Sequence, residues 1–132
     1  MKIVVLLAAM TRGGIDLLQS LLDKHPEISQ LPGKFYIDEF LEKINNKNNY
    51  GIAQQFIDCY PEYFDSRLNI VERHNFLGQK KNEFYLIDKN KFIKKFNELS
   101  KNKKLNKKEI IINLHLAYSS ASGDSIDEKK LV

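Results

Sequence analysis

The sequence of 132 residues has no tryptophan, three prolines and a single cysteine, Cys59. One cysteine excludes an intrachain disulfide and a metal site built from several thiolates. Cys59 falls in a helical pattern beside aromatic residues, which indicates a buried structural thiol and not a catalytic one. No apolar run approaches the roughly 20 residues of a membrane span, and the start of the chain lacks a signal peptide's layout. We therefore expect a cytoplasmic protein without a membrane span.

Metal-ligand spacing is also missing around the three histidines. His25 precedes a proline at an expected helix end, where its partly buried imidazole is predicted to meet the last carbonyl groups. His74 falls in a loop region, and His115 falls on an expected helix with no acid at ligand spacing. We predict no metal site.

Positive charge is concentrated in one stretch of the chain. Residues 80–108 hold 11 lysines and three acidic residues, a net charge of +8, whereas the whole chain carries +4. Such a stretch can face nucleic acid or an acidic membrane. This one contains no arginine, and its aromatic residues occupy core-like positions, so we favour a solvated face over a nucleic-acid-binding one.

Apolar patterning predicts one strong strand followed mostly by helices. Residues 3–9 form a nearly continuous apolar run, typical of a parallel strand that helices cover on both faces. Helical spacing follows at residues 15–25, 37–44 and 52–60, with an asparagine-rich turn at residues 45–49. The chain is therefore predicted to be an α/β protein with a parallel sheet.

The second half of the chain contains helix signals of its own. Residues 65–79 are predicted to be loop with short structure, and residues 84–87 a short extended piece. Asp88 and Asn106 are predicted to cap the next two helices, and Gly123 to terminate the last one.

The end of the sequence suggests an incomplete sheet. Residues 129–132 resemble the approach to a second strand that is cut off as it begins. We therefore predict a single domain, residues 1–132, truncated at its C-terminus. The unpaired edges of its first strand favour self-association. The alternative is a small, mostly helical domain with a poorly paired strand.

The connection between the first strand and the first helix carries the clearest functional pattern. Residues 10–14 contain two glycines and Arg12, and a helix start offers unpaired N–H groups together with the positive end of the helix dipole. These features favour a phosphate-like anion. Asp16 places a negative charge in the first turn, where an anion would be repelled.

This connection resembles the loop of the sulfotransferase family. That loop typically reads Pro-Arg/Lys-Ser-Gly-Thr-Thr between a strand and a helix, and here residues 11–16 read Thr-Arg-Gly-Gly-Ile-Asp. The helix then reaches Leu-Leu-Asp-Lys-His-Pro at residues 21–26, an ending found at the same spacing in tyrosylprotein and many bacterial sulfotransferases. The resemblance covers about the first 33 residues. The NTPase loop G-x-x-x-x-G-K-[ST] is absent, which disfavours another P-loop-like transferase.

The resemblance implies a P-loop-like fold and transfer of a sulfuryl group from 3′-phosphoadenosine 5′-phosphosulfate to a hydroxyl of a small-molecule or carbohydrate acceptor. It implies that Arg12 stabilises charge on the bridging oxygen and that Gly14 lets the backbone approach the donor. Both threonine hydroxyls of the family loop are lost, because Ile15 and Asp16 stand in their places. The implied donor-binding positions are Thr11, Arg12, Gly13, Gly14, Ile15 and Asp16.

Two parts of the family's site are not found. The catalytic base is unknown, since Asp38 and Glu39 read more readily as first-turn helix residues. The arginine and serine that hold the 3′-phosphate have no counterpart, because neither Arg67 nor Arg73 follows a convincing strand. A non-catalytic module of the same fold, with its anion site filled by Asp16, is the alternative.

Overall fold

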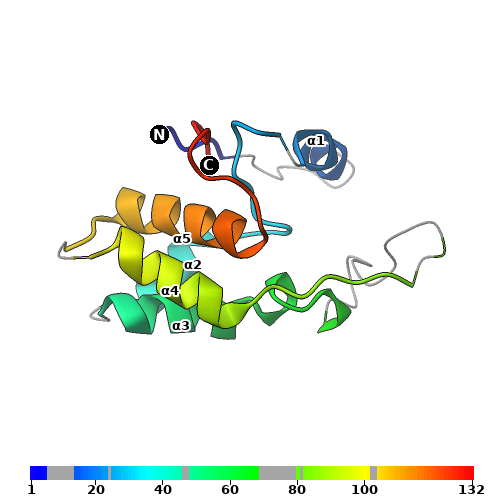
Figure 1. The fold of residues 1–132 in the computed structure, drawn as a ribbon. Helices are drawn as coiled ribbons and strands as arrows, with labels where there is room; N and C mark the ends of the chain where they lie inside the picture. The colour runs from blue at the N-terminus through cyan, green and yellow to red at the C-terminus, as the bar shows by residue number, and fades with distance from the viewer. Residues whose placement is uncertain (6–13, 24, 46–47, 69–79, 81, 102–103) are drawn as a thin grey trace.

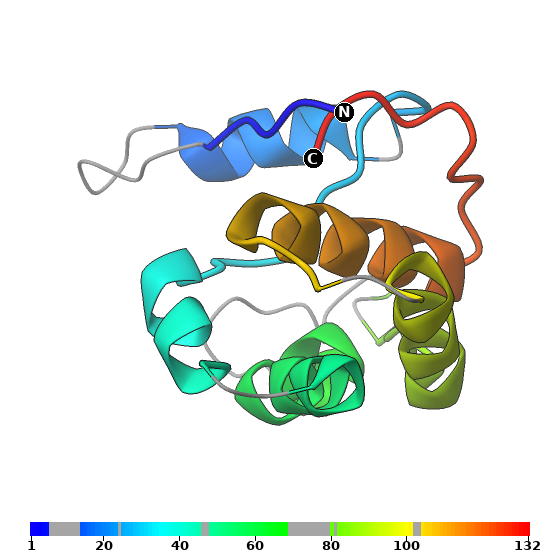
Figure 2. The same ribbon diagram turned by 90° about the vertical axis from the view of Figure 1, so that its left-hand side faces the viewer.

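The computed structural model describes residues 1–5, 14–23, 25–45, 48–68, 80, 82–101 and 104–132. These residues form two layers, one built from helices α2 to α5 and the other from α1 together with both ends of the chain (Figures 1 and 2). The α-helices are α1 (Ile15–Leu22), α2 (Ile37–Lys43), α3 (Asn49–Cys59), α4 (Lys89–Leu99) and α5 (Lys107–Ala121). Two short 3₁₀-helices, η1 (Pro61–Tyr63) and η2 (Ser66–Leu68), follow α3. Among the residues in these ranges, no helix has the length and apolar character needed to cross a membrane.

Local capping chemistry explains where α4 and α5 begin. The Asp88 side chain accepts hydrogen bonds from the N–H groups of Asn90 (2.9 Å) and Lys91 (3.1 Å). Asn106 and Glu109 form a reciprocal capping box, each side chain accepting from the other's backbone N–H at 2.9 Å. Both caps satisfy N–H groups that have no partner inside the helix, and both predicted starts are confirmed.

The end of α5 is set by Gly123, as predicted. Gly123 has a φ of 90°, in the left-handed region that side chains disfavour. Its N–H donates to Ser120, and the N–H of Asp124 donates to Ser119, which is the Schellman arrangement. The start of α3 was predicted too late, because Asn48 caps it by accepting from the N–H of Gly51 at 2.8 Å.

Aromatic rings fill the core between α2, α3, α4 and α5. Phe56 of α3 has no exposed surface and lies at the centre. Its ring packs edge-on against Phe40 at 5.6 Å and stacks on Phe92 at 5.5 Å, with the ring planes 27° apart. Each such pair adds about 0.5–1.5 kcal/mol beyond the burial of its area. The Tyr118 hydroxyl donates to the carbonyl of Tyr63 at 2.6 Å, so this buried hydroxyl has a hydrogen-bond partner.

The prediction of an α/β fold with a P-loop-like parallel sheet and one strong N-terminal strand is wrong. Over the described ranges the chain is mostly helical, and no sheet forms. Leu131 makes isolated parallel bridges to Lys2 and to Ile28, so residues near 131 lie between two other segments. Val4 and Val5 are each 55% exposed, and helices therefore do not cover both faces of this segment. The buried apolar cluster of the described residues instead lies mainly between helices. Residues 6–9 of the predicted strand lie outside the described ranges.

Candidate functional site

The start of α1 is the described part of the predicted anion site. Gly14 precedes the helix with φ 74° and ψ 9°, a left-handed conformation, and no side chain caps the helix there. The carbonyl of Gly14 accepts the first helical bond, from the N–H of Leu18 at 2.9 Å. A Cβ built on Gly14 meets no atom within 4 Å, so the backbone is open on this side. An uncapped helix start of this kind presents N–H groups and partial positive charge to a ligand.

The six predicted donor-binding positions divide into two groups. Thr11, Arg12 and Gly13 lie outside the described residues. Gly14 begins the described segment, and the backbone of Ile15 and Asp16 forms the first turn of α1. The glycine that the sequence predicted to permit close approach thus takes a conformation that favours glycine.

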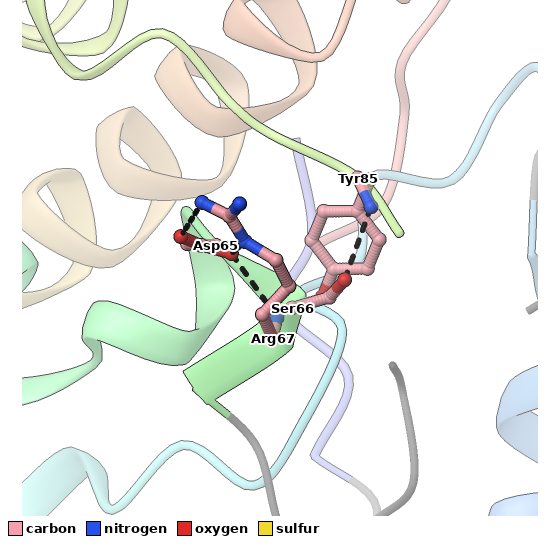
Figure 3. Close-up of polar contacts among 4 residues, drawn as sticks. All are labelled: Asp65, Ser66, Arg67 and Tyr85. Atoms are coloured by element: carbon pink, nitrogen blue, oxygen red, sulfur yellow. Dashed lines mark hydrogen bonds and ion pairs between the residues drawn. The ribbon is translucent and has the colours of Figure 1, made fainter. Parts of the chain in front are cut away.

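Arg67, considered for a 3′-phosphate site, is engaged by a neighbouring acid (Figure 3). Its guanidinium donates from Nε at 2.8 Å and from Nη2 at 2.6 Å to the two carboxylate oxygens of Asp65. This pairing lowers the pKa of Asp65 and raises that of Arg67. The guanidinium also lies 4.7 Å from the ring centre of Phe84. An incoming phosphate would have to displace Asp65, so Arg67 is a poor phosphate ligand here.

The segment around Arg67 is held by a short antiparallel contact. Ser66 is buried, and its hydroxyl accepts from the N–H of Tyr85 at 3.0 Å, as Figure 3 shows. Asp65 and Leu86 form an isolated antiparallel bridge. The predicted extended piece at residues 84–87 therefore does pair, and it pairs with the region after η1. Arg73 lies outside the described residues.

Neither candidate base has a catalytic environment. Asp38 and Glu39 are exposed and occupy the first turn of α2, where acids stabilise the positive end of a helix. Both acids thus stabilise the start of α2, the structural role that the sequence favoured.

The His25 imidazole does not take the role predicted for it at the end of α1. Its side chain is exposed, and its Nδ1 accepts a hydrogen bond from the N–H of Glu27 at 3.2 Å. The imidazole therefore does not meet the last carbonyls of α1. The carbonyl of His25 instead accepts from the Lys129 ammonium at 3.1 Å.

Lys129 is a feature that sequence patterns did not reveal. It is only 8% exposed, and its ammonium also donates to the carbonyl of Ile28 at 2.8 Å. The next residue, Lys130, pairs with Glu27, and this contact lowers the pKa of Glu27. The two lysines attach the C-terminal segment to the turn that follows α1.

His115 joins the two layers of the molecule. Its Nδ1 lies 3.1 Å from the carbonyl of Ser29, and since a carbonyl only accepts, Nδ1 is the protonated nitrogen. The Ser29 hydroxyl in turn lies 2.6 Å from that of Ser119 and donates to the His115 carbonyl at 3.0 Å. The ring of Phe35 lies beside the imidazole, 6.3 Å between centres. Removal from water lowers the pKa of His115 to about 4, although the contact with Ser29 opposes the shift.

The remaining candidate groups fit structural roles. Cys59 packs against the aromatic core, with its Sγ 3.3 Å from Nε2 of Gln55. Within the described ranges, no three histidine, cysteine, aspartate or glutamate side chains are placed to hold a metal ion. A comparison with family models, curated proteins and solved structures finds no match for this chain.

Proposed function

We propose that residues 11–16 bind the 5′-phosphosulfate side of 3′-phosphoadenosine 5′-phosphosulfate in a sulfotransferase-like reaction. The observation that carries the proposal is the left-handed, uncapped Gly14 at the start of α1. It stands where the sulfotransferase loop has its close-approach glycine, and the helix start behind it favours an anion. The proposal includes a cytoplasmic location, as expected from the sequence.

The residues of the loop have separate roles in this proposal. Arg12 supplies the positive charge that stabilises the oxygen of the breaking sulfur–oxygen bond, and backbone N–H groups at the start of α1 bind the phosphate. The acceptor hydroxyl forms the new oxygen–sulfur bond and loses its proton to a base that is still unidentified. The acceptor is a small molecule or a carbohydrate.

Nucleotide binding is the direct test. We expect titration calorimetry to detect a heat of binding between the chain and 3′-phosphoadenosine 5′-phosphate at millimolar ligand. The Arg12→Gln variant should bind the nucleotide at least tenfold more weakly. Gly14→Ala should weaken it as well, because a side chain at φ 74° is strained by about 1–2 kcal/mol. The control is Lys94→Gln, which removes one exposed positive charge from α4. The proposal is contradicted if the wild-type chain gives no heat of binding. It is also contradicted if Lys94→Gln loses as much nucleotide affinity as Arg12→Gln.

A second candidate is a non-catalytic module in which Asp16 fills the anion site. It is favoured by the helical fold of the described residues, which supplies no parallel sheet to carry the second half of a nucleotide site. Asp16→Thr is then expected to create or strengthen nucleotide binding. Asp16→Ala should lower the melting temperature by a few degrees, because a first-turn acid contributes about 0.3–1 kcal/mol. If both variants behave as wild type, Asp16 has neither role.

A further inference from the structure

One end of the helical layer brings together the start of α3, the end of α4 and the start of α5. The Ser100 carbonyl, at the end of α4, accepts a hydrogen bond from Nδ2 of Asn49 in the first turn of α3 at 2.9 Å. The Ser100 hydroxyl accepts one from Nδ2 of Asn113 in α5 at 3.2 Å. We call this surface, residues 49–50, 100–101 and 104–108, the basic end. It lies on the left in Figure 1 and faces the viewer in Figure 2.

Four exposed lysines lie on the basic end, namely Lys101, Lys104, Lys107 and Lys108. No acidic side chain in the described part of the chain lies within ion-pair distance of them. The acids nearest in sequence have other partners, since Glu98 lies 3.7 Å from Lys95 and Glu109 accepts from the N–H of Asn106. The basic end therefore presents positive charge that the described residues do not neutralise.

The lysines at the start of α5 oppose the local preference of a helix. Lys107 and Lys108 occupy its first turn, where the partial positive charge of the helix dipole disfavours a cation. Residues that break a local rule without a stabilising gain are typical of functional surfaces. This placement favours a role for the two lysines in binding an anion.

An exposed aromatic ring lies on the same surface. Tyr50 follows Asn49 in the first turn of α3 and is 60% exposed. Phe92 and Phe96, the aromatic residues of α4, are fully buried, as the sequence predicted. The exposed ring thus comes from a helix outside the lysine-rich stretch, and only the fold places it beside the lysines.

We infer that the basic end binds single-stranded nucleic acid. Its ammonium groups contact the phosphates, and the Tyr50 ring stacks on one base, the combination that single-strand-binding surfaces use. The residues of the basic end include no arginine, the side chain that most often reads guanine, so binding tolerates different sequences. The start of α1 belongs to the other layer, and the inference therefore does not depend on the proposed function.

The side chains of the basic end favour nucleic acid over a lipid surface. Tyr50 is the single large apolar side chain exposed on its residues, whereas segments that lie on membranes insert several apolar groups. A single strand is favoured over a duplex because its bases are free to stack on the ring. Tyr50 also changes the reading of the lysines as a solvated face, which rested on the lack of an exposed aromatic residue.

Fluorescence anisotropy of the full chain with a fluorescein-labelled oligothymidylate of about 12 nucleotides tests the inference. Four phosphate contacts predict that log K falls with log salt concentration with a slope of about −3. The Lys104→Gln/Lys107→Gln/Lys108→Gln variant should bind at least tenfold more weakly, with a slope of about −1. Tyr50→Ala should bind at least fivefold more weakly, with the wild-type slope. All these variants should keep the wild-type circular dichroism, because each side chain is exposed.

Matched controls separate position from total charge and from loss of any exposed ring. Lys34→Gln/Lys89→Gln/Lys91→Gln removes the same charge from exposed lysines outside the basic end and should bind within about threefold of the wild type. Tyr36→Ala removes a ring that is 56% exposed before α2 and should leave the affinity unchanged.

Several results would overturn the inference. They are a wild-type chain at about 100 µM that leaves the oligonucleotide free at low salt, equal losses in the two triple variants, and a Tyr50→Ala change with no effect. An Arg12→Gln variant that loses as much affinity as the lysine variant would place the oligonucleotide at the anion site of α1. Binding of the wild type to phosphatidylserine vesicles but not to the oligonucleotide would assign the basic end to lipid.

Discussion

The burial of His115 makes the stability of the protein depend on pH in a defined window. The pKa of His115 is about 4 in the folded chain, against an ordinary value of 6.5, because folding removes the imidazole from water. Between these two values the unfolded chain binds a proton that the folded chain does not. Stability is therefore complete above pH 6.5 and is lost as the pH falls toward 4.

The size of the effect follows from the two pKa values. A shift from 6.5 to about 4 corresponds to about 3 kcal/mol when the whole window is crossed. Between pH 7 and pH 5 the same linkage gives a loss of about 2 kcal/mol. The carboxyl groups of Glu27 and Asp65 have pKa values below their ordinary ones. Their effect on the pH dependence of stability therefore falls below pH 5.

Urea unfolding at pH 7 and at pH 5 measures this loss directly. We expect the wild-type free energy of unfolding to fall by about 2 kcal/mol, and that of His115→Asn by less than about 0.5 kcal/mol. Asparagine keeps an N–H donor for the Ser29 carbonyl but cannot take up a proton. The control is His25→Asn, which removes an exposed histidine and should keep the wild-type loss. A wild type of equal stability at both pH values, or a full loss in His115→Asn, would refute this reasoning.

Two further predictions concern the helical layer. Phe56→Ala removes the central ring of the core and should cost about 3–5 kcal/mol in urea unfolding, whereas Tyr50→Ala at a 60% exposed position should cost less than about 1 kcal/mol. If the two variants lose similar amounts of unfolding free energy, Phe56 is not at the centre of the core. Asn106→Ala removes the cap of α5 and should cost about 1 kcal/mol, seen as a melting temperature several degrees lower, while Asn106→Asp should retain most of the stability. A neutral Asn106→Ala change would mean that α5 begins without this cap.

Features that depend on neighbouring residues could be predicted from the sequence. Asp88, Asn106 and Gly123 act on backbone groups within about four positions, so the residue types alone indicated the helix ends. Gly14 belongs to the same class, since its left-handed conformation is a local property.

Features that depend on distant pairing could not be predicted. His115 meets Ser29 across 86 positions, and Lys129 meets the carbonyl of Ile28 across 101, with no sequence pattern that links them. The nearly continuous apolar run at residues 3–9 predicts a strand that helices cover on both faces, because such strands have this composition. Whether a strand is covered, however, depends on which helices pack against it, and here Val4 and Val5 are exposed.

The parallel contacts of Leu131 with Lys2 and Ile28 have a consequence for the order of events during synthesis. The N-terminal segment emerges from the ribosome long before residues 130–132, which are its described backbone partners. The helical layer is held mainly by contacts of α4 with α5 and of α3 with α4, which are closer in sequence than the contacts of residues 2–4 with residues 130–132. Helices can therefore pack early, while the N-terminal segment lacks its partners until residues 130–132 are made. During that interval its exposed valines are open to chaperones and to other nascent chains.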